Sequence, residues 1–236
     1  MKRLKSLKTV AVNFSIVLML VGLFTLTMTN DVRSVFSPAY NNLFYRGNTA
    51  QKNVTLMVNV YWGNEYLPSM LQSFKDYGIK TTFFVGGMWV SKYPEDFLSI
   101  VNDGHEIGNH GFFHKDHSKL SYKENQQEIF DTHKIVKQYT DTDMCLFAPP
   151  SGAFNDYTIQ TANNLGYKVI MWSRDTIDWR DKDSNLIYER ATKNLGNGEL
   201  ILMHPTLQTA QALPKILEYC KQNNFEIVPI SSNITI

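Results

Sequence analysis

The segment VTLMVNVYWGNEYLPSMLQSFKDYGIKTTFFV, residues 54–85, decides the fold class of this chain. It begins with an apolar, β-branched run at residues 54–60 and ends with a second such run at residues 80–85. Between them, residues 65–77 have the pattern of a helix that stops at Gly78. A strand, a helix and a second strand in this order predict a βα unit and a parallel sheet.

The same alternation continues to the end of the chain, with no internal repeat and no linker. Further strands are expected at residues 105–108, 144–147, 168–172, 200–203 and 226–229, and further helices at 91–102, 121–139, 156–164, 185–194 and 209–223. Strands that alternate with helices in this number fit an α/β fold, a deformed (β/α)7-type barrel that is closed or nearly closed. We expect it to form a single domain over residues 53–236.

Size and charge exclude some classes of function. The chain has 236 residues and a formal net charge of +1, and much of its positive excess lies in the first few residues. It is large enough to bury its own core and has no basic surface that would suit a nucleic acid. Two cysteines, Cys145 and Cys220, are too few for a disulfide framework. We expect a monomer with no nucleic-acid partner.

The first 30 residues differ in kind from the rest. Four basic residues precede an apolar run over about residues 9–28; they are Lys2, Arg3, Lys5 and Lys8. A run of about 20 apolar residues can span a bilayer as a helix, and the basic flank predicts a cytoplasmic start. The segment is either an uncleaved signal anchor or a cleaved secretory signal, and the lack of a small-x-small cleavage pattern favours the anchor. In both cases residues 31–52 are a tether. The domain then lies outside the cell membrane on a single-pass anchor, or is secreted if the segment is cleaved.

Polar or aromatic clusters follow five of the expected strands. They are residues 59–65, His110 with His114, residues 149–155, residues 175–179, and His204. Chemistry in a βα barrel collects at the carboxyl ends of the strands. A helix cap explains Asn155 by itself, but five clusters at one end of a barrel indicate a functional site.

The two histidines lie in GHEIGNHGFFH, residues 104–114, and are four residues apart. Imidazole is a good ligand for Zn²⁺, and this spacing lets both rings point into one pocket. The alternative is a pair of surface histidines beside Lys115 and Asp116. The neighbouring clusters favour metal ligands.

These motifs resemble the polysaccharide deacetylases with a NodB-type homology domain, a family of metal-dependent carbohydrate esterases that act on N-acetyl sugars. Residues 104–114 resemble the family's second motif, residues 147–152 its third, residues 175–179 its fourth and residues 200–204 its fifth. The similarity covers residues 54–229. The anchored layout is similar to the spore-cortex and cell-wall members of the family.

The resemblance implies a divalent metal, expected to be Zn²⁺, held by two histidines and one carboxylate, and it assigns His110 and His114 to that metal. His204 matches the acid that protonates the leaving amine, and Asp175 or Asp178 would orient it.

The resemblance also assigns the groove that holds the sugar. Trp179 matches one wall, and the backbone N–H of Ser151 matches the donor to the developing oxyanion. Tyr61 and Trp62 add aromatic surface, which suits the faces of a sugar.

The first motif departs from the family pattern. Active members carry two adjacent aspartates before a glycine, the first as base and the second on the metal, whereas this chain has Asn59-Val60-Tyr61-Trp62-Gly63. A register shifted by two puts the neutral Asn59 under the first aspartate. Ala148 stands where the family has an arginine that pairs with the base. Since an unpaired buried guanidinium is costly, the two losses are coupled.

Other side chains are candidates for the vacant metal position. Glu65 is the nearest carboxylate and Asn59 a neutral alternative, with Asp116 and His117 further away. Glu65 has an equally simple explanation as an acid that interacts with a helix dipole.

Two functions therefore remain open. One is a metal-dependent deacetylase that hydrolyses the C–N amide bonds of N-acetyl sugars in peptidoglycan. It would be slowed by the loss of its base, which typically costs about 10²–10⁴-fold. The other is a catalytically inactive glycan-binding pseudoenzyme in cell-wall or spore-cortex assembly. The retained Asp175, Asp178 and His204 favour the enzyme, and the missing aspartates favour the binder.

Overall fold

The computed structural model describes residues 13–22 and 38–234, and the chain divides into two compact units, Met1–Asn41 and Asn42–Ile236. In the first unit, residues 13–22 form a helix whose apolar side chains, such as Phe14 and Met19, are exposed. No helix within the described ranges is both long and apolar enough to cross a membrane. The rest of the span predicted at residues 9–28 lies outside the described residues.

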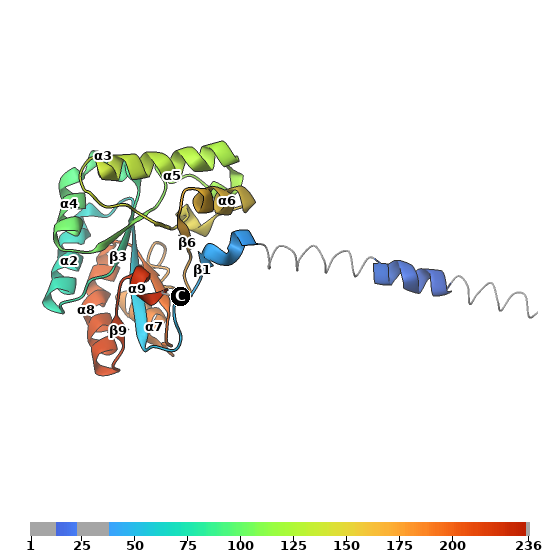
Figure 1. Cartoon of the computed structure of the whole chain (residues 1–236). Helices are drawn as coiled ribbons and strands as arrows, with labels where there is room; N and C mark the ends of the chain where they lie inside the picture. The colour runs from blue at the N-terminus through green and yellow to red at the C-terminus, as the bar shows by residue number, and fades with distance from the viewer. Residues whose placement is uncertain (1–12, 23–37, 235–236) are drawn as a thin grey trace, which may run out of the picture. The chain divides into compact units, whose positions relative to one another are not determined.

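The second unit is a curled parallel sheet surrounded by helices (Figure 1). The strands are β1 (Leu43–Phe44), β2 (Asn53–Val60), β3 (Thr82–Val85), β4 (Glu106–Asn109), β5 (Leu146–Phe147), β6 (Lys168–Ile170), β7 (Arg174–Asp175), β8 (Leu200–Met203) and β9 (Glu226–Ile227). Their order is β1-β6-β5-β4-β3-β2-β8-β7, with β9 paired to β2, and each pairing is parallel. β2 pairs with β3, β8 and β9, and seven of its eight residues are buried.

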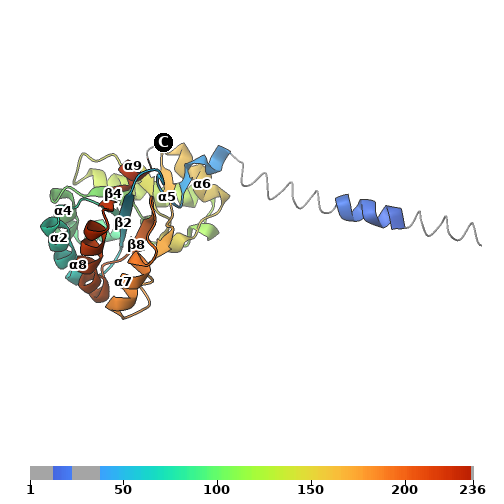
Figure 2. The same ribbon diagram turned by 90° about the horizontal axis from the view of Figure 1, so that it is seen from below.

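The helices cover the outside of the sheet. They are α2 (Leu67–Asp76), α3 (Gly87–Lys92), α4 (Pro94–Asn102), α5 (Tyr122–Lys137), α6 (Asp156–Asn164), α7 (Ser184–Thr192), α8 (Leu207–Gln222) and α9 (Ile230–Asn233). Helices α2, α4 and α8 group on one flank, and α5 and α6 lie on another (Figures 1 and 2). Each long helix turns an apolar stripe inward, as Phe74 and Met70 do on α2.

The described strands form a half-barrel, and this differs from the closed or nearly closed barrel expected from the sequence. β1 and β7 are the two ends of the strand path. The chain crosses between the edges at residues 171–173, where the Met171 N–H donates to the carbonyl of Phe44 and the Ser173 N–H donates to the carbonyl of Leu200. This crossing divides the strand predicted at residues 168–172 into β6 and β7.

Two further boundaries differ from the prediction. The helix expected at residues 91–102 is two helices, α3 and α4, because Pro94 starts a new helix at the position where its missing N–H costs nothing. Residues 43–44, assigned to a tether over residues 31–52, instead pair with β6, and Arg46 forms a bridge to Glu199. The capping box of Ser121 and Glu124 at the start of α5 is confirmed.

Candidate functional site

A pocket of 360 Å³ opens at the carboxyl ends of the strands. Its lining comes from the segments that follow β2, β4, β5, β6 and β8, together with β7; the residues are Asn59, Tyr61, Trp62, His110, His114, Ser151, Trp172, Asp175, Trp179, Leu202 and His204. All of these residues lie in strands predicted from the sequence or follow them, so the structure brings these strand ends together as expected. Trp172 and Leu202 line the pocket although the sequence did not mark them as candidate site residues.

His110 directly follows β4 and is buried. Its Nδ1 lies 2.7 Å from the carbonyl oxygen of Ala148. Burial, with a further contribution from nearby His114, lowers the pKa of His110 well below its usual value, so the ring is neutral near pH 7. A neutral ring that donates its Nδ1–H to this carbonyl has its lone pair on Nε2, which is the form that binds a metal or accepts a hydrogen bond.

His114 lies beside His110, with 5.0 Å between the two ring centroids. Its backbone is left-handed, with φ of 55°, an uncommon conformation for a residue with a side chain. Burial also lowers the pKa of His114. Two neutral rings therefore share this part of the pocket.

A buried carboxylate from α5 holds the loop that carries His114. Oε2 of Glu128 accepts hydrogen bonds from the N–H groups of Phe112 and Phe113, at 2.9 Å and 2.7 Å. Its Oε1 lies 3.1 Å from Nζ of Lys115. Glu128 thus fixes the backbone on the N-terminal side of His114, a role that the sequence analysis missed.

His204 and Asp178 form a hydrogen-bonded pair. Nδ1 of His204 lies 2.8 Å from Oδ1 of Asp178, whose side chain is fully buried. The backbone N–H of His204 and the hydroxyl of Thr209 also donate to Oδ2 of Asp178, each at 2.6 Å. Of the two aspartates considered from the sequence, Asp178 contacts His204. Asp175 lines the pocket and accepts a hydrogen bond from the Ile177 N–H at 2.7 Å.

Two aromatic rings fill the end of β2. Trp62 stacks on His204, with ring centroids 5.8 Å apart and planes 7° from parallel. The ring of Tyr61 lies 5.0 Å from that of His114. It also packs on Gly86, where a Cβ atom would lie 2.2 Å from the tyrosine ring.

The remaining predicted site residues lie on the rim or the floor of the pocket. Ser151 is exposed and left-handed, with φ of 55°, and Trp179 is 56% exposed with the Arg180 guanidinium 5.8 Å from its ring centroid. Asn59 is buried on the floor, and its Oδ1 has no hydrogen-bond partner within the described residues. That oxygen is free to accept a hydrogen bond from a ligand.

The other candidate metal ligands lie elsewhere. Glu65 lines a neighbouring cavity, and Asp116 caps residues His117–Lys119 and pairs with Lys119. Buried His117 is bonded to Asn125 through Nδ1. Across residues 13–22 and 38–234, no group of three or more His, Cys, Asp or Glu side chains is arranged to hold a metal ion. Two neutral imidazoles without a carboxylate do not fit the zinc set implied by the resemblance.

The fold and the pocket define a (β/α) protein with its candidate site at the carboxyl ends of the strands. The family model of polysaccharide deacetylases matches residues 46–170, and the chain belongs to this family. The family expected from the sequence motifs is therefore confirmed.

Three relatives are informative. The chain is 36% identical to the uncharacterized protein YlxY of Bacillus subtilis over 78% of its own length and 57% of that protein's length. It is 32% identical to a peptidoglycan-N-acetylglucosamine deacetylase of Bacillus cereus, over 70% of this chain and 80% of the enzyme. It is also similar to BA3943 of Bacillus anthracis, described as a CE4 family pseudoenzyme, with a TM-score of 0.80 and 34% identity over 82% of this chain and 69% of that one. A mutant of BA3943 described as having restored enzymatic activity has the same TM-score.

Proposed function

We propose that this protein binds N-acetylated cell-wall glycan in the pocket at the mouth of its half-barrel and has lost the rapid deacetylation of its enzyme relatives. The observation that carries the proposal is that two aromatic residues, Tyr61 and Trp62, directly follow β2. We take Tyr61 and Trp62 to occupy the positions of the family's two aspartates. Their rings pack on His114 and His204, so they take up space beside the residues that an active member would use.

The pocket retains what a sugar needs for binding. Tyr61, Trp62, Trp172 and Trp179 supply aromatic surface, on which the C–H face of a pyranose packs. The unpartnered Oδ1 of Asn59 supplies an acceptor at the floor. A pocket of 360 Å³ lies within the range of small-molecule sites. The naming of relatives as peptidoglycan deacetylases supports a cell-wall glycan as the ligand.

Slow hydrolysis is the second candidate, and the intact pair of Asp178 and His204 favours it. A carboxylate on Nδ1 orients an imidazole so that Nε2 faces the pocket, where it is able to pass a proton to a leaving amine. Burying such a pair carries a desolvation cost, so a gain in stability is a weak explanation for it, and a functional role is the better one. Loss of the base alone costs about 10²–10⁴-fold, so weak activity is compatible with the site.

The experiment measures binding and acetate release on the same preparation of the full chain in detergent. Acetylated glycan should bind, whereas its de-N-acetylated form should bind more weakly, and acetate release should stay at least about 10²-fold below that of the Bacillus cereus enzyme, as expected for a lost base. Acetate release at the rate of the Bacillus cereus enzyme would refute the proposal that this protein has lost rapid deacetylation. The triple variant Tyr61→Asp, Trp62→Asp, Ala148→Arg should gain activity when Zn²⁺ is added. No gain would mean that the first motif is placed wrongly.

We also propose that the N-terminal segment carries the protein through the cell membrane and leaves residues 53–236 outside. The basic residues at its start and the exposed apolar side chains of residues 13–22 support this. Protease added to intact cells should degrade the domain. Protection until the cells are lysed would refute this location.

A further inference from the structure

A short segment near the start of the second unit connects the two ends of the strand path. Both residues of β1 pair with β6, near one end of that path. Arg46 then forms an antiparallel bridge with Glu199, which directly precedes β8, near the other end. The Gly47 N–H donates to the carbonyl of Gly198 at 2.7 Å. We call residues 43–47 the strap.

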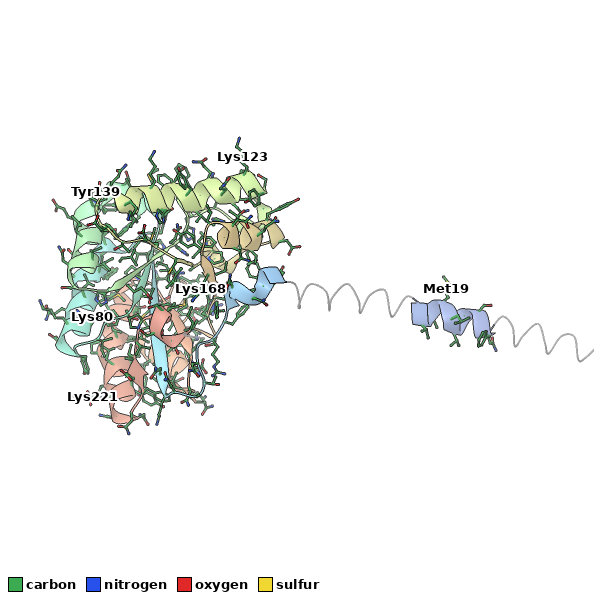
Figure 3. All side chains as sticks on the ribbon, viewed as in Figure 1. Met19, Lys80, Lys123, Tyr139, Lys168 and Lys221 are labelled. Atoms are coloured by element: carbon green, nitrogen blue, oxygen red, sulfur yellow. The ribbon has the colours of Figure 1, made fainter. Side chains whose placement is uncertain are left out.

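The strap contacts the crossing segment, residues 171–173, which passes from β6 to β7. The carbonyl of Phe44 accepts a hydrogen bond from the Met171 N–H at 2.8 Å. Lys168, at the start of β6, lies beside the strap, and its ammonium is 5.9 Å from the centroid of the Phe44 ring (Figure 3). The strap therefore fixes the chain on the N-terminal side of Trp172.

On the C-terminal side of Trp172, the strap acts through Glu199. The Arg46 guanidinium donates to Oε1 of Glu199, and the Ser173 hydroxyl donates to Oε2 at 2.9 Å. The side chain of Glu199 is only 9% exposed, and Arg174 is a second, more distant partner of Oε1 at 3.5 Å. Because a nearly buried carboxylate needs its partners, the loss of Arg46 should disturb Glu199 and the serine bonded to it.

Trp172 lies between these two points of attachment, and its side chain lines the pocket. The ring is partly buried against the core of the domain. It also packs on Gly152, where a Cβ atom would lie 2.6 Å from Cη2 of the tryptophan. A side chain that is supported on both sides of its backbone and behind its ring is held in one orientation. The strap itself does not line the pocket.

We propose that Arg46 is a positioning residue for the pocket, which holds the Trp172 ring against the bound ligand through Glu199. This inference rests on the proposed function, which supplies the ligand, an N-acetylated sugar. Substitutions that act on a ligand site through intervening contacts change its affinity by about 2–30-fold. The Arg46 side chain is 44% exposed, and ion pairs of such residues contribute little to overall stability. Loss of Arg46 should therefore weaken sugar binding and leave the domain folded.

The test incorporates 5-fluorotryptophan into the full chain in detergent, which gives one fluorine NMR signal for each of the four tryptophans. The Trp172→Phe variant assigns the signal of Trp172. In Arg46→Met this signal should shift or broaden, and N-acetylglucosamine should bind about threefold or more weakly. Arg46→Lys, which keeps a donor for Glu199, should restore most of both. Ser173→Ala, which breaks the same connection at its other end, should resemble Arg46→Met.

Lys137→Met is the matched control, because Lys137 also forms a partly exposed ion pair, with Asp143 at 2.9 Å, and lies on α5. It should leave the Trp172 signal and the affinity unchanged. In a Trp172→Ala background, Arg46→Met should weaken binding no further, as a double-mutant cycle would measure. A general loss of structure would also change the signal of Trp89, which is buried in the core.

Two results would overturn the inference. One is a Trp172 signal in Arg46→Met that matches the wild type, and the other is an equal loss of affinity with and without Trp172. If N-acetylglucosamine does not bind the wild type, the proposed function fails, and the Trp172 signal alone decides whether Arg46 positions the ring.

Discussion

Substitutions of Glu128 test how the loop that carries His114 is held. The truncating variant Glu128→Ala and the isosteric variant Glu128→Gln should behave differently. In Glu128→Ala, the N–H groups of Phe112 and Phe113 lose their acceptor. An unsatisfied buried donor costs about 1–3 kcal/mol. Because these hydrogen bonds are only partly buried, we expect the two together to cost about 2–4 kcal/mol.

Glu128→Gln should be much milder. Both N–H groups donate to the same oxygen, Oε2, so a glutamine with its amide oxygen in that place keeps both hydrogen bonds. It loses the ion pair with Lys115, whose side chain is about half exposed, and such pairs contribute about 0–1 kcal/mol. Because both variants lose the ion pair, the alanine variant should be less stable than the glutamine variant by the cost of the two hydrogen bonds, about 2–4 kcal/mol.

Urea unfolding of both variants, followed by tryptophan fluorescence, measures this difference. Amide exchange provides the local readout, since the N–H groups of Phe112 and Phe113 should exchange slowly in the wild type and the glutamine variant and rapidly in the alanine variant. If the two variants have the same free energy of unfolding within about 0.5 kcal/mol, the usual scatter for surface changes, Glu128 does not hold the loop.

Three further predictions concern stability. Burial lowers the pKa of His105 from 6.5 to about 4, so the unfolded chain binds a proton that the native chain does not, and the free energy of unfolding should fall by up to about 1.4 kcal/mol per pH unit as pH drops from 6.5 toward 4. Urea unfolding of His105→Gln, repeated at several pH values, should show an unfolding free energy that depends less on pH, by the equivalent of up to one proton. Gly86→Ala should cost about 1–3 kcal/mol by overpacking against Tyr61, and the cost should nearly vanish in a Tyr61→Ala background, as a double-mutant cycle would reveal. Asp178→Asn, which leaves one of three donors facing an amide, should lower the thermal midpoint well beyond Asp175→Asn, where only one backbone N–H is affected.

The parts of the fold that the sequence predicts are those in which local pattern and burial agree. The strand at residues 54–60 is predicted correctly because a short apolar, β-branched run is typical of a strand that is buried on both faces of a parallel sheet. β1 escapes prediction because its two residues are too few to form a pattern, and its partner β6 lies more than a hundred residues later in the chain. Its place in the sheet is decided by tertiary contact alone.

The candidate site divides in the same way. His110, His114 and His204 come together because each lies at or just beyond a strand end, and parallel strands bring these ends to one edge. Glu128 comes from the middle of helix α5 and contacts the backbone of the loop that carries His114. A signal for it was available, since Asn125, Glu128 and Thr132 form a polar line on the face of α5 that is otherwise apolar and buried.

The residues packed around the end of β2 fit the two aromatic rings of Tyr61 and Trp62. The Tyr61 ring needs position 86 to lack a Cβ atom, and the Trp62 ring covers one face of His204. Aspartates at both positions would leave a gap over Gly86 and uncover His204. The double variant Tyr61→Asp, Trp62→Asp should therefore be less stable than the wild type by about 1–3 kcal/mol, less than a full core truncation because both rings are partly exposed. A variant that gained turnover and kept the stability of the wild type would show that the surrounding residues had not adapted to the two rings.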